Sequence, residues 1–479
     1  TLTNDGDILQ KDSIVRFTNG ILNNSTNGSY ELESGDLRAQ SGTLFTFNNS
    51  GRFVKTTDST SVVDIVFDNN GGTVDIQEGV LQLTRLNNSI DGGSLIVDGD
   101  GALEFRNNTT FSNTVTGTGT GKVRLVSGTF TADGQATLDF VEGGVEWNGG
   151  IIGGTGELIN QGVFEISGSD KFLRSTLTNE GDILHKDSVV RFTNGILNNS
   201  TDGNYELESG DLRAQSGTLF TFNNSGTFTK TTDSIATIDV AFNNQDGIVN
   251  VQQGELRLSR GGNNTNGVYL LSDSGSLNFA GGSHKLSGTT TVSGNSLVRI
   301  SGGTVEIGDG SSNFETALFE ITDGTLTANG ETVITGTGLW TGGAISGSEK
   351  FLNEGDFEIR GDNKTLSVLF SNEGSVIHDG STIFFDNATL NNTATSTYEL
   401  RSGALVARGN SRNWTFNNSG VLNKTTNSNS IVDTIFNNAG TVVVQDGTLS
   451  FTRGYTQFAG TTRLLGGDLT SSTPLNIQA

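Results

Sequence analysis

The chain repeats itself on a large scale. Residues 1–51 and 176–226 are identical except at five positions: Asp5/Glu180, Gln10/His185, Ile14/Val189, Asn27/Asp202 and Ser29/Asn204. A third and more divergent copy begins near Leu369. Self-similarity of this length is typical of stacked repeat architectures, in which each repeat contacts only its neighbours. We therefore interpret residues 1–479 as one continuous solenoid made of three super-repeats, at about 1–150, 151–343 and 344–479.

A shorter period runs inside each super-repeat. An asparagine recurs after an apolar residue and before small polar residues and glycine, and in the first copy its positions are separated by 20, 25 and 20 residues. The recurring asparagines are Asn4, Asn24, Asn49, Asn69, Asn160, Asn179, Asn199, Asn224, Asn244, Asn353, Asn372, Asn392, Asn418 and Asn438. A period of about 20 residues predicts one turn of a β-helix, and therefore roughly 22 turns in the whole chain.

The residues between these asparagines read as short strands. Segments such as 29–33 and 43–47 alternate apolar and polar residues, which indicates strands with one buried face. Glycine and asparagine supply the positive φ that sharp corners need, and the chain has a single proline. Because parallel crossover connections are almost always right-handed, we expect an all-β, right-handed parallel β-helix.

The recurring asparagines have a physical role in this prediction. If they stack at one corner, successive side-chain amides can hydrogen-bond along the axis, as in cross-β assemblies. We therefore expect a structural ladder of asparagines at the corner.

Charge excludes several classes of partner. The formal net charge is −24, from 52 acidic and 28 basic residues, so nucleic acid and anionic lipid should be repelled. The apolar stretches are too short to cross a bilayer, and we expect no membrane insertion. With no cysteine in the chain, thiolate metal sites are excluded. We expect no cofactor, although weak and nonspecific Ca²⁺ association with the acidic surface is compatible with this charge.

The densest charged cluster lies at residues 30–38. Alternation places Tyr30, Leu32 and Leu37 inward. The carboxylates Glu31, Glu33 and Asp36 then point outward, either as an acid/base pair or as a solvated surface. The third copy carries Arg401, Ala404 and Val406 where the first has Glu33, Asp36 and Arg38, which favours the solvated surface.

Other residues of catalytic type are few. His185 and His378 occupy one column of the repeat, where the first copy has Gln10, and we interpret this column as an exposed polar position. The segments 98–101 (Asp-Gly-Asp-Gly) and 309–312 (Asp-Gly-Ser-Ser) faintly resemble calcium loops, and we interpret both as turns. We therefore expect no enzyme.

Three motifs carry a resemblance to a known group of proteins. They are the segment 454–478, the Trp-x-Gly-Gly-x-Ile motif at Trp147 and Trp340, and the repeated Leu-x-Asn-x-Gly. The chain resembles the very large bacterial β-strand-repeat surface proteins, similar to filamentous-haemagglutinin-type and autotransporter passengers and frequent in cyanobacteria. The resemblance implies an extracellular or cell-surface protein with a role in adhesion or fibre formation.

Two functions follow as expectations. The first is a structural β-solenoid segment of a surface filament, sheath or matrix fibre, in which copies join head to tail because an open turn is a template for another turn. The alternative is a rod-like adhesin that binds cell-surface polysaccharide through exposed aromatic residues, with Trp147, Trp340 and Trp414 as candidates.

Overall fold

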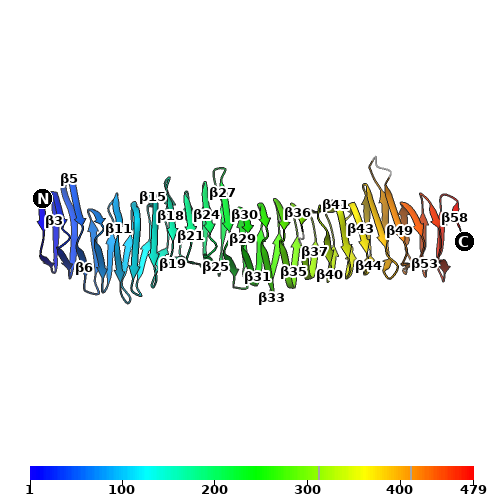
Figure 1. The fold of residues 1–479 in the computed structure, drawn as a ribbon, viewed down its shortest axis with the longest axis horizontal. Coiled ribbons are helices and arrows are strands. Elements are labelled where there is room, and N and C mark those ends of the chain that lie inside the picture. The colour runs from blue at the N-terminus through cyan, green and yellow to red at the C-terminus, as the bar shows by residue number, and fades with distance from the viewer. Residues whose placement is uncertain (311–312, 410–412, 479) are drawn as a thin grey trace. The chain divides into compact units, whose positions relative to one another are not determined.

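The predicted fold class is confirmed in the computed structural model, which describes residues 1–310, 313–409 and 413–478. Over these residues the chain is all-β, and parallel strands stack into a β-solenoid of about 22 turns with roughly 21 residues per turn (Figure 1). The described part contains no helix, and so none that could span a bilayer. The chain divides into two compact units, Thr1–Ala241 and Phe242–Ala479.

Each turn of the first unit contributes to three faces. Its first strands are β1 (Leu2–Asn4), β2 (Asp7–Gln10), β3 (Ser13–Asn24), β4 (Ser29–Leu32), β5 (Gly35–Asn49), β6 (Arg52–Lys55), β7 (Thr60–Asp64), β8 (Val66–Asn70), β9 (Thr73–Ile76), β10 (Val80–Leu83) and β11 (Asn88–Val97). β1 pairs with β3, β3 with β5, and β5 with β8, all in parallel. β2, β4, β6 and β9 pair in the same way on a second face.

Alternation fixes the core. In β4, Tyr30 and Leu32 are buried while Ser29 and Glu31 are partly exposed, as the sequence predicts. Aromatic rings from successive turns meet inside: the rings of Phe47 and Phe67 stack with their centroids 5.5 Å apart, and Phe53 meets Phe47 edge to face. Stacked and edge-to-face pairs are the favoured aromatic geometries.

The corners use glycine where no side chain fits. Gly35 has φ +101°, and a Cβ built on it would lie 1.8 Å from the carbonyl oxygen of Ser13. Gly210 and Gly403 hold the corresponding places in the second and third copies, with φ +110° and +99°. The recurrence of glycine at this corner therefore has a steric cause.

Equivalent residues of successive super-repeats do not lie on the same face of the solenoid but on neighbouring faces. In the first copy the asparagine column runs Asn4, Asn24, Asn49, Asn69 and then Ile90. The face that holds this column continues through β17 (Ile151–Gly153) and β20 (Lys171–Leu173) to β23 (Ser188–Phe192). β23 carries no ladder asparagine.

The second asparagine column lies on the neighbouring face of the first unit. It begins on β18 (Glu157–Asn160) and continues through β21 (Thr176–Asn179) and β24 (Gly195–Asn199). β18 pairs with β15 (Thr129–Phe140), and successive pairings connect β15 back to β2, β4, β6 and β9. All of these strands therefore contribute to one face. A surface feature repeated in each copy therefore reappears one face further round.

The same shift occurs inside the second unit. The column of Asn244 and Asn264 leads, through successive pairings, to β45 (Ser381–Phe385). That column passes through the N-terminal parts of β41 (Ala344–Asn353) and β43 (Lys364–Asn372). The ladder asparagines of the third copy lie on another face, at the C-terminal ends of these two strands and on β46 (Ala388–Asn392), β49 (Trp414–Asn418) and β52 (Ile435–Asn438).

Candidate functional site

The structure brings the recurring asparagines together in buried ladders. In the first copy, Nδ2 of Asn4 donates to Oδ1 of Asn24 at 2.8 Å, Asn24 donates to Asn49 at 2.8 Å, and Asn49 donates to Asn69 at 2.7 Å. Each of these four side chains is at most 6% exposed. The second proton of Nδ2 is also used, because Asn24 donates to the carbonyl oxygen of Arg52 at 3.1 Å. The amides thus hold the corner backbone as well as each other.

The other two copies contain the same arrangement. Asn160, Asn179, Asn199 and Asn224 are joined by amide–amide hydrogen bonds of 2.8 Å. Asn353, Asn372, Asn392, Asn418 and Asn438 are joined at 2.7–2.8 Å. Asn244 is also buried, and its Nδ2 donates to the carbonyl oxygen of Gly247 at 3.1 Å. These contacts join the amides to one another and to the corner backbone inside the solenoid, although the buried Oδ1 of Asn353 accepts no hydrogen bond.

The histidine column is buried, so the prediction of an exposed position was wrong. His185 and His378 are both 0% exposed. Nδ1 of His185 lies 2.8 Å from the hydroxyl of Tyr205, and its Nε2 lies 3.0 Å from the carbonyl oxygen of Ser188. His378 makes the corresponding contacts with Tyr398 at 3.0 Å and Ser381 at 2.8 Å.

Gln10 of the first copy identifies the tautomer of these histidines. Its Nε2 donates to the carbonyl oxygen of Ser13 at 2.9 Å, and its Oε1 accepts from the hydroxyl of Tyr30 at 2.5 Å. An amide has fixed donor and acceptor ends, whereas a neutral imidazole can hold its proton on either nitrogen. By correspondence, His185 carries its proton on Nε2 and accepts from Tyr205 at Nδ1.

Burial keeps this column neutral. Desolvation lowers the pKa of His185 and of His378 to about 4, against the opposing effect of their hydrogen bonds to Ser188 and Ser381. The ammonium groups of Lys171 and Lys364 lower these two pKa values further. Ser188 Oγ lies 3.1 Å from His185 Nε2, but the serine is only 5% exposed, so this pair has no open route to a substrate.

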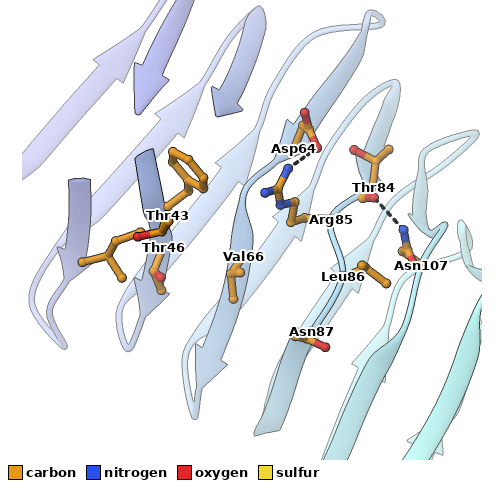
Figure 2. A pocket seen from close by; sticks show the side chains of 11 residues that line it. Thr43, Thr46, Asp64, Val66, Thr84, Arg85, Leu86, Asn87 and Asn107 are labelled. Atoms are coloured by element: carbon orange, nitrogen blue, oxygen red, sulfur yellow. Dashed lines mark hydrogen bonds and ion pairs between the residues drawn. The ribbon is translucent and has the colours of Figure 1, made fainter. Parts of the chain in front are cut away.

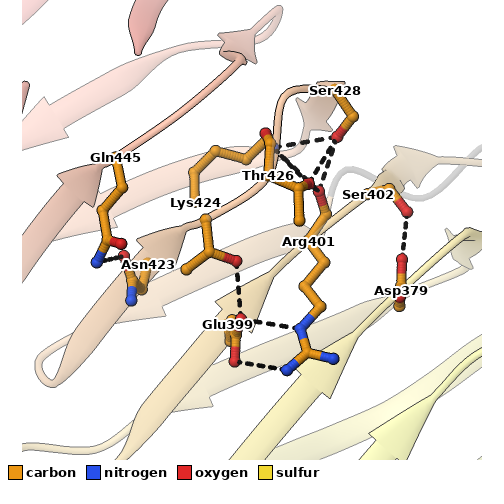
Figure 3. A network of polar contacts seen from close by, with 10 residues as sticks. Asp379, Glu399, Arg401, Ser402, Asn423, Lys424, Thr426, Ser428 and Gln445 are labelled. Atoms are coloured by element: carbon orange, nitrogen blue, oxygen red, sulfur yellow. Dashed lines mark hydrogen bonds and ion pairs between the residues drawn. The ribbon is translucent and has the colours of Figure 1, made fainter. Parts of the chain in front are cut away.

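Buried lysines form a second polar cluster that the sequence analysis missed. Nζ of Lys424 donates to the carbonyl oxygen of Arg401 at 3.0 Å, to Ser428 Oγ at 3.1 Å and to Thr426 Oγ1 at 3.2 Å, although Lys424 is 0% exposed (Figure 3). Desolvation lowers the pKa of Lys424. The signal was present as Lys-Thr-Thr-Asp/Asn-Ser, which occurs at 55–59, 230–234 and 424–428.

The tryptophans expected to be exposed are mostly inside. Trp147 on β16 (Val145–Trp147) and Trp340 on β40 (Thr337–Trp340) are both 0% exposed, which corrects that prediction. Trp147 lies two residues after the buried Val145, and Trp340 lies two residues after the buried Gly338. Period-two alternation therefore places each tryptophan on the inward face of its strand. Trp414 is half-buried, its Nε1 donates to the carbonyl oxygen of Arg408 at 2.7 Å, and the guanidinium of Arg453 lies 4.9 Å from its ring centroid.

The outward carboxylates make ion pairs and hydrogen bonds. Asp36 accepts from Arg38 at 3.0 Å, and Glu33 accepts from Lys11 at 2.7 Å. Asp98 begins a turn closed by a hydrogen bond from Gly101 N to Asp98 O, whereas the segment 309–312 ends outside the described residues. Among the residues that are described, no three His, Asp or Glu side chains are grouped so as to hold a metal ion.

Comparison with known proteins adds no assignment. No protein-family model matches the chain, and no curated protein sequence matches it. The function is therefore inferred from the geometry of the solenoid.

Proposed function

We propose that the protein is a structural, non-catalytic β-solenoid segment of an extracellular filament, sheath or matrix fibre, and that copies associate head to tail. The resemblance to bacterial β-strand-repeat surface proteins supports the extracellular location. The pairing of outward carboxylates with arginine and lysine favours a structural role over acid/base catalysis, because these groups already have partners.

One comparison between copies carries the proposal. In the second copy, Leu177 and Val190 are 1% and 2% exposed, because the preceding turn on β18 and β20 covers them. The corresponding Leu2 and Val15 in the first copy are 55% and 36% exposed. Within the repeat, the apolar surface of Leu177 and Val190 is therefore covered by a neighbouring turn, and we propose that copies associate head to tail through the same kind of contact. Unpaired strand edges beside an apolar surface favour this kind of contact.

Electron microscopy of the purified chain at neutral pH, with and without Ca²⁺, tests the proposal. We expect filaments in which solenoid segments join end to end. A Leu2→Asp/Val15→Asp variant should shorten them, while Val141→Asp, at a side chain that is 67% exposed elsewhere in the first unit, should not. Discrete particles of the unmodified chain under both conditions would contradict end-to-end assembly. A Ca²⁺ effect would indicate weak screening of the acidic surface.

The second candidate is an adhesin that binds carbohydrate. Trp147 and Trp340 cannot form its binding surface because both are buried. A surface hollow beside Arg85 favours this candidate, since it combines exposed leucines with polar side chains.

A further inference from the structure

A groove crosses one corner of the first unit. Between β7 and β8 the chain turns through the single residue Ile65, which is fully buried. The corners of the turns on either side are longer: residues 40–44 of β5 bulge outward, and residues 84–87 connect β10 to β11. The short corner between two long ones leaves a hollow of about 580 Å³, which we call the first-copy groove (Figure 2). Its walls are two turns apart, or about 10 Å at the usual strand spacing.

The groove combines polar and apolar side chains. The guanidinium of Arg85 lies 5.3 Å from the ring centroid of Phe45 and 3.8 Å from the carboxylate of Asp64. Leu44 and Leu86 stand at the walls, 44% and 50% exposed. Figure 2 shows Arg85 directed toward Asp64, with Asn107 bonded to the backbone of Thr84 at the far wall.

The aromatic–arginine–aspartate cluster recurs in the third copy. Arg453 lies over Trp414 at 4.9 Å and contacts Asp433 at 3.1 Å. There too a single buried residue, Thr434, separates β51 (Asn429–Asp433) from β52. The second copy has Phe220, Asp239 and Arg260 at the corresponding positions of the sequence.

We propose that the first-copy groove binds an uncharged saccharide chain. Planar polar groups such as Arg85, Asp64 and Asn107 can exchange hydrogen bonds with sugar hydroxyls, and Leu44 and Leu86 can cover the apolar faces of the rings. Arg85 already has Asp64 as a counter-ion, and the net charge of −24 repels polyanions.

An extended peptide is the weaker candidate. Peptides that add to a sheet need a free strand edge. β7 is paired on both sides, with β5 and β10, and β8 is paired with β5 and β11. The corner therefore presents side chains instead of an unpaired backbone.

Hydrogen exchange measured by mass spectrometry on the full chain tests the proposal. Dextran and cellohexaose serve as uncharged probes, and alginate serves as the polyanion. We expect an uncharged probe to slow exchange at residues 41–46 and 84–91, and alginate to leave it unchanged. The Leu44→Asp/Leu86→Asp variant should need about ten times more probe to reach the same protection. Both side chains are substantially exposed, so the thermal unfolding midpoint should not change.

Val141→Asp is the control, since it replaces an exposed apolar side chain by a carboxylate in the first unit, away from the groove. It should keep full protection. The proposal is overturned if neither uncharged probe protects these segments, if the double variant is protected like the unmodified chain, or if alginate protects them more strongly. These outcomes are separate from filament formation, because neither Leu2 nor Val15 lines the groove.

Discussion

Replacing His185 and His378 by glutamine should remove part of the acid sensitivity of the fold. The first copy already has Gln10 at this position, with the same two partners, a serine carbonyl and a tyrosine hydroxyl. His185→Gln and His378→Gln therefore keep both hydrogen bonds and remove only the titratable group. At pH 7 we expect each variant to be as stable as the parent to within about 1 kcal/mol.

The magnitude follows from the pKa values. Burial lowers the pKa of each histidine to about 4, compared with 6.5 in the unfolded chain. The unfolded state therefore binds the proton first, so the stability is complete above pH 6.5 and is lost as the pH falls from 6.5 through 4. Between pH 7 and pH 4.5 the free energy of unfolding should fall by about 2.5 kcal/mol for each histidine.

Urea unfolding followed by tryptophan fluorescence at pH 7.0 and pH 4.5 measures this loss. Trp147 and His185 lie in one buried column, two turns apart, and so do Trp340 and His378. Each single variant should be more stable than the parent at pH 4.5 by about 2.5 kcal/mol in the transition of its own unit. Gln10→His is the reciprocal test and should add acid sensitivity in the first copy.

Equal losses for the parent and the variants on acidification would refute the reasoning. That result would mean that the histidines are protonated in the folded state, and hence that their column is hydrated. Because the aspartates and glutamates are unchanged in all variants, their contribution to acid unfolding cancels in the comparison.

Three further changes test the ladder, the buried lysines and a corner. Asn392→Leu removes a donor and an acceptor inside the third ladder and should lower the free energy of unfolding in urea by about 2–4 kcal/mol. Asn391→Thr, on the half-exposed side of the same strand, should lower it by under about 1 kcal/mol. Equal losses would contradict a buried ladder. Burial lowers the pKa of Lys364 from 10.5 to about 8. Between these two pH values the unfolded chain binds the proton and the folded chain does not, so the free energy of unfolding of the parent should rise with pH over this range. The Lys364→Met variant should show a smaller rise. Gly210→Ala should destabilise the first unit by more than about 2 kcal/mol in thermal unfolding, because its Cβ would lie 2.1 Å from the carbonyl oxygen of Ser188; an unchanged midpoint would argue against this corner geometry.

The sequence was most informative where one residue type recurs at a fixed interval. The asparagine spacing predicts both the length of a turn and the set of residues that meet along the axis, because a ladder needs the same group once per turn. It was misleading where polarity was taken as a sign of exposure. Ile183 and His185 are two residues apart on one strand and share the buried face, so alternation alone would have placed the histidine inside.

The one-face shift between copies could not be read from the sequence. The starts of the first two copies are offset by 175 residues, whereas Trp147 and Trp340 are offset by 193, and this difference of 18 residues suggests an added turn. Turn lengths vary from one turn to the next, however, and small differences accumulate over each super-repeat. Only the pairing of strands shows that the second asparagine column starts on the face of β2 instead of β1.

This shift has a consequence for binding. If successive copies lay in phase, equivalent grooves would line one side of the solenoid, and a single saccharide strand could follow them. In the first unit, Asp64 ends β7, but the corresponding Asp239 ends β29 (Ile235–Asp239), which lies on the face of the first asparagine ladder. Equivalent corners of the first two copies are therefore one face apart. If the corners of both copies bind saccharide as proposed for the first-copy groove, separate strands would lie on different sides, and the chain would cross-link a matrix more readily than it would hold one strand along its length.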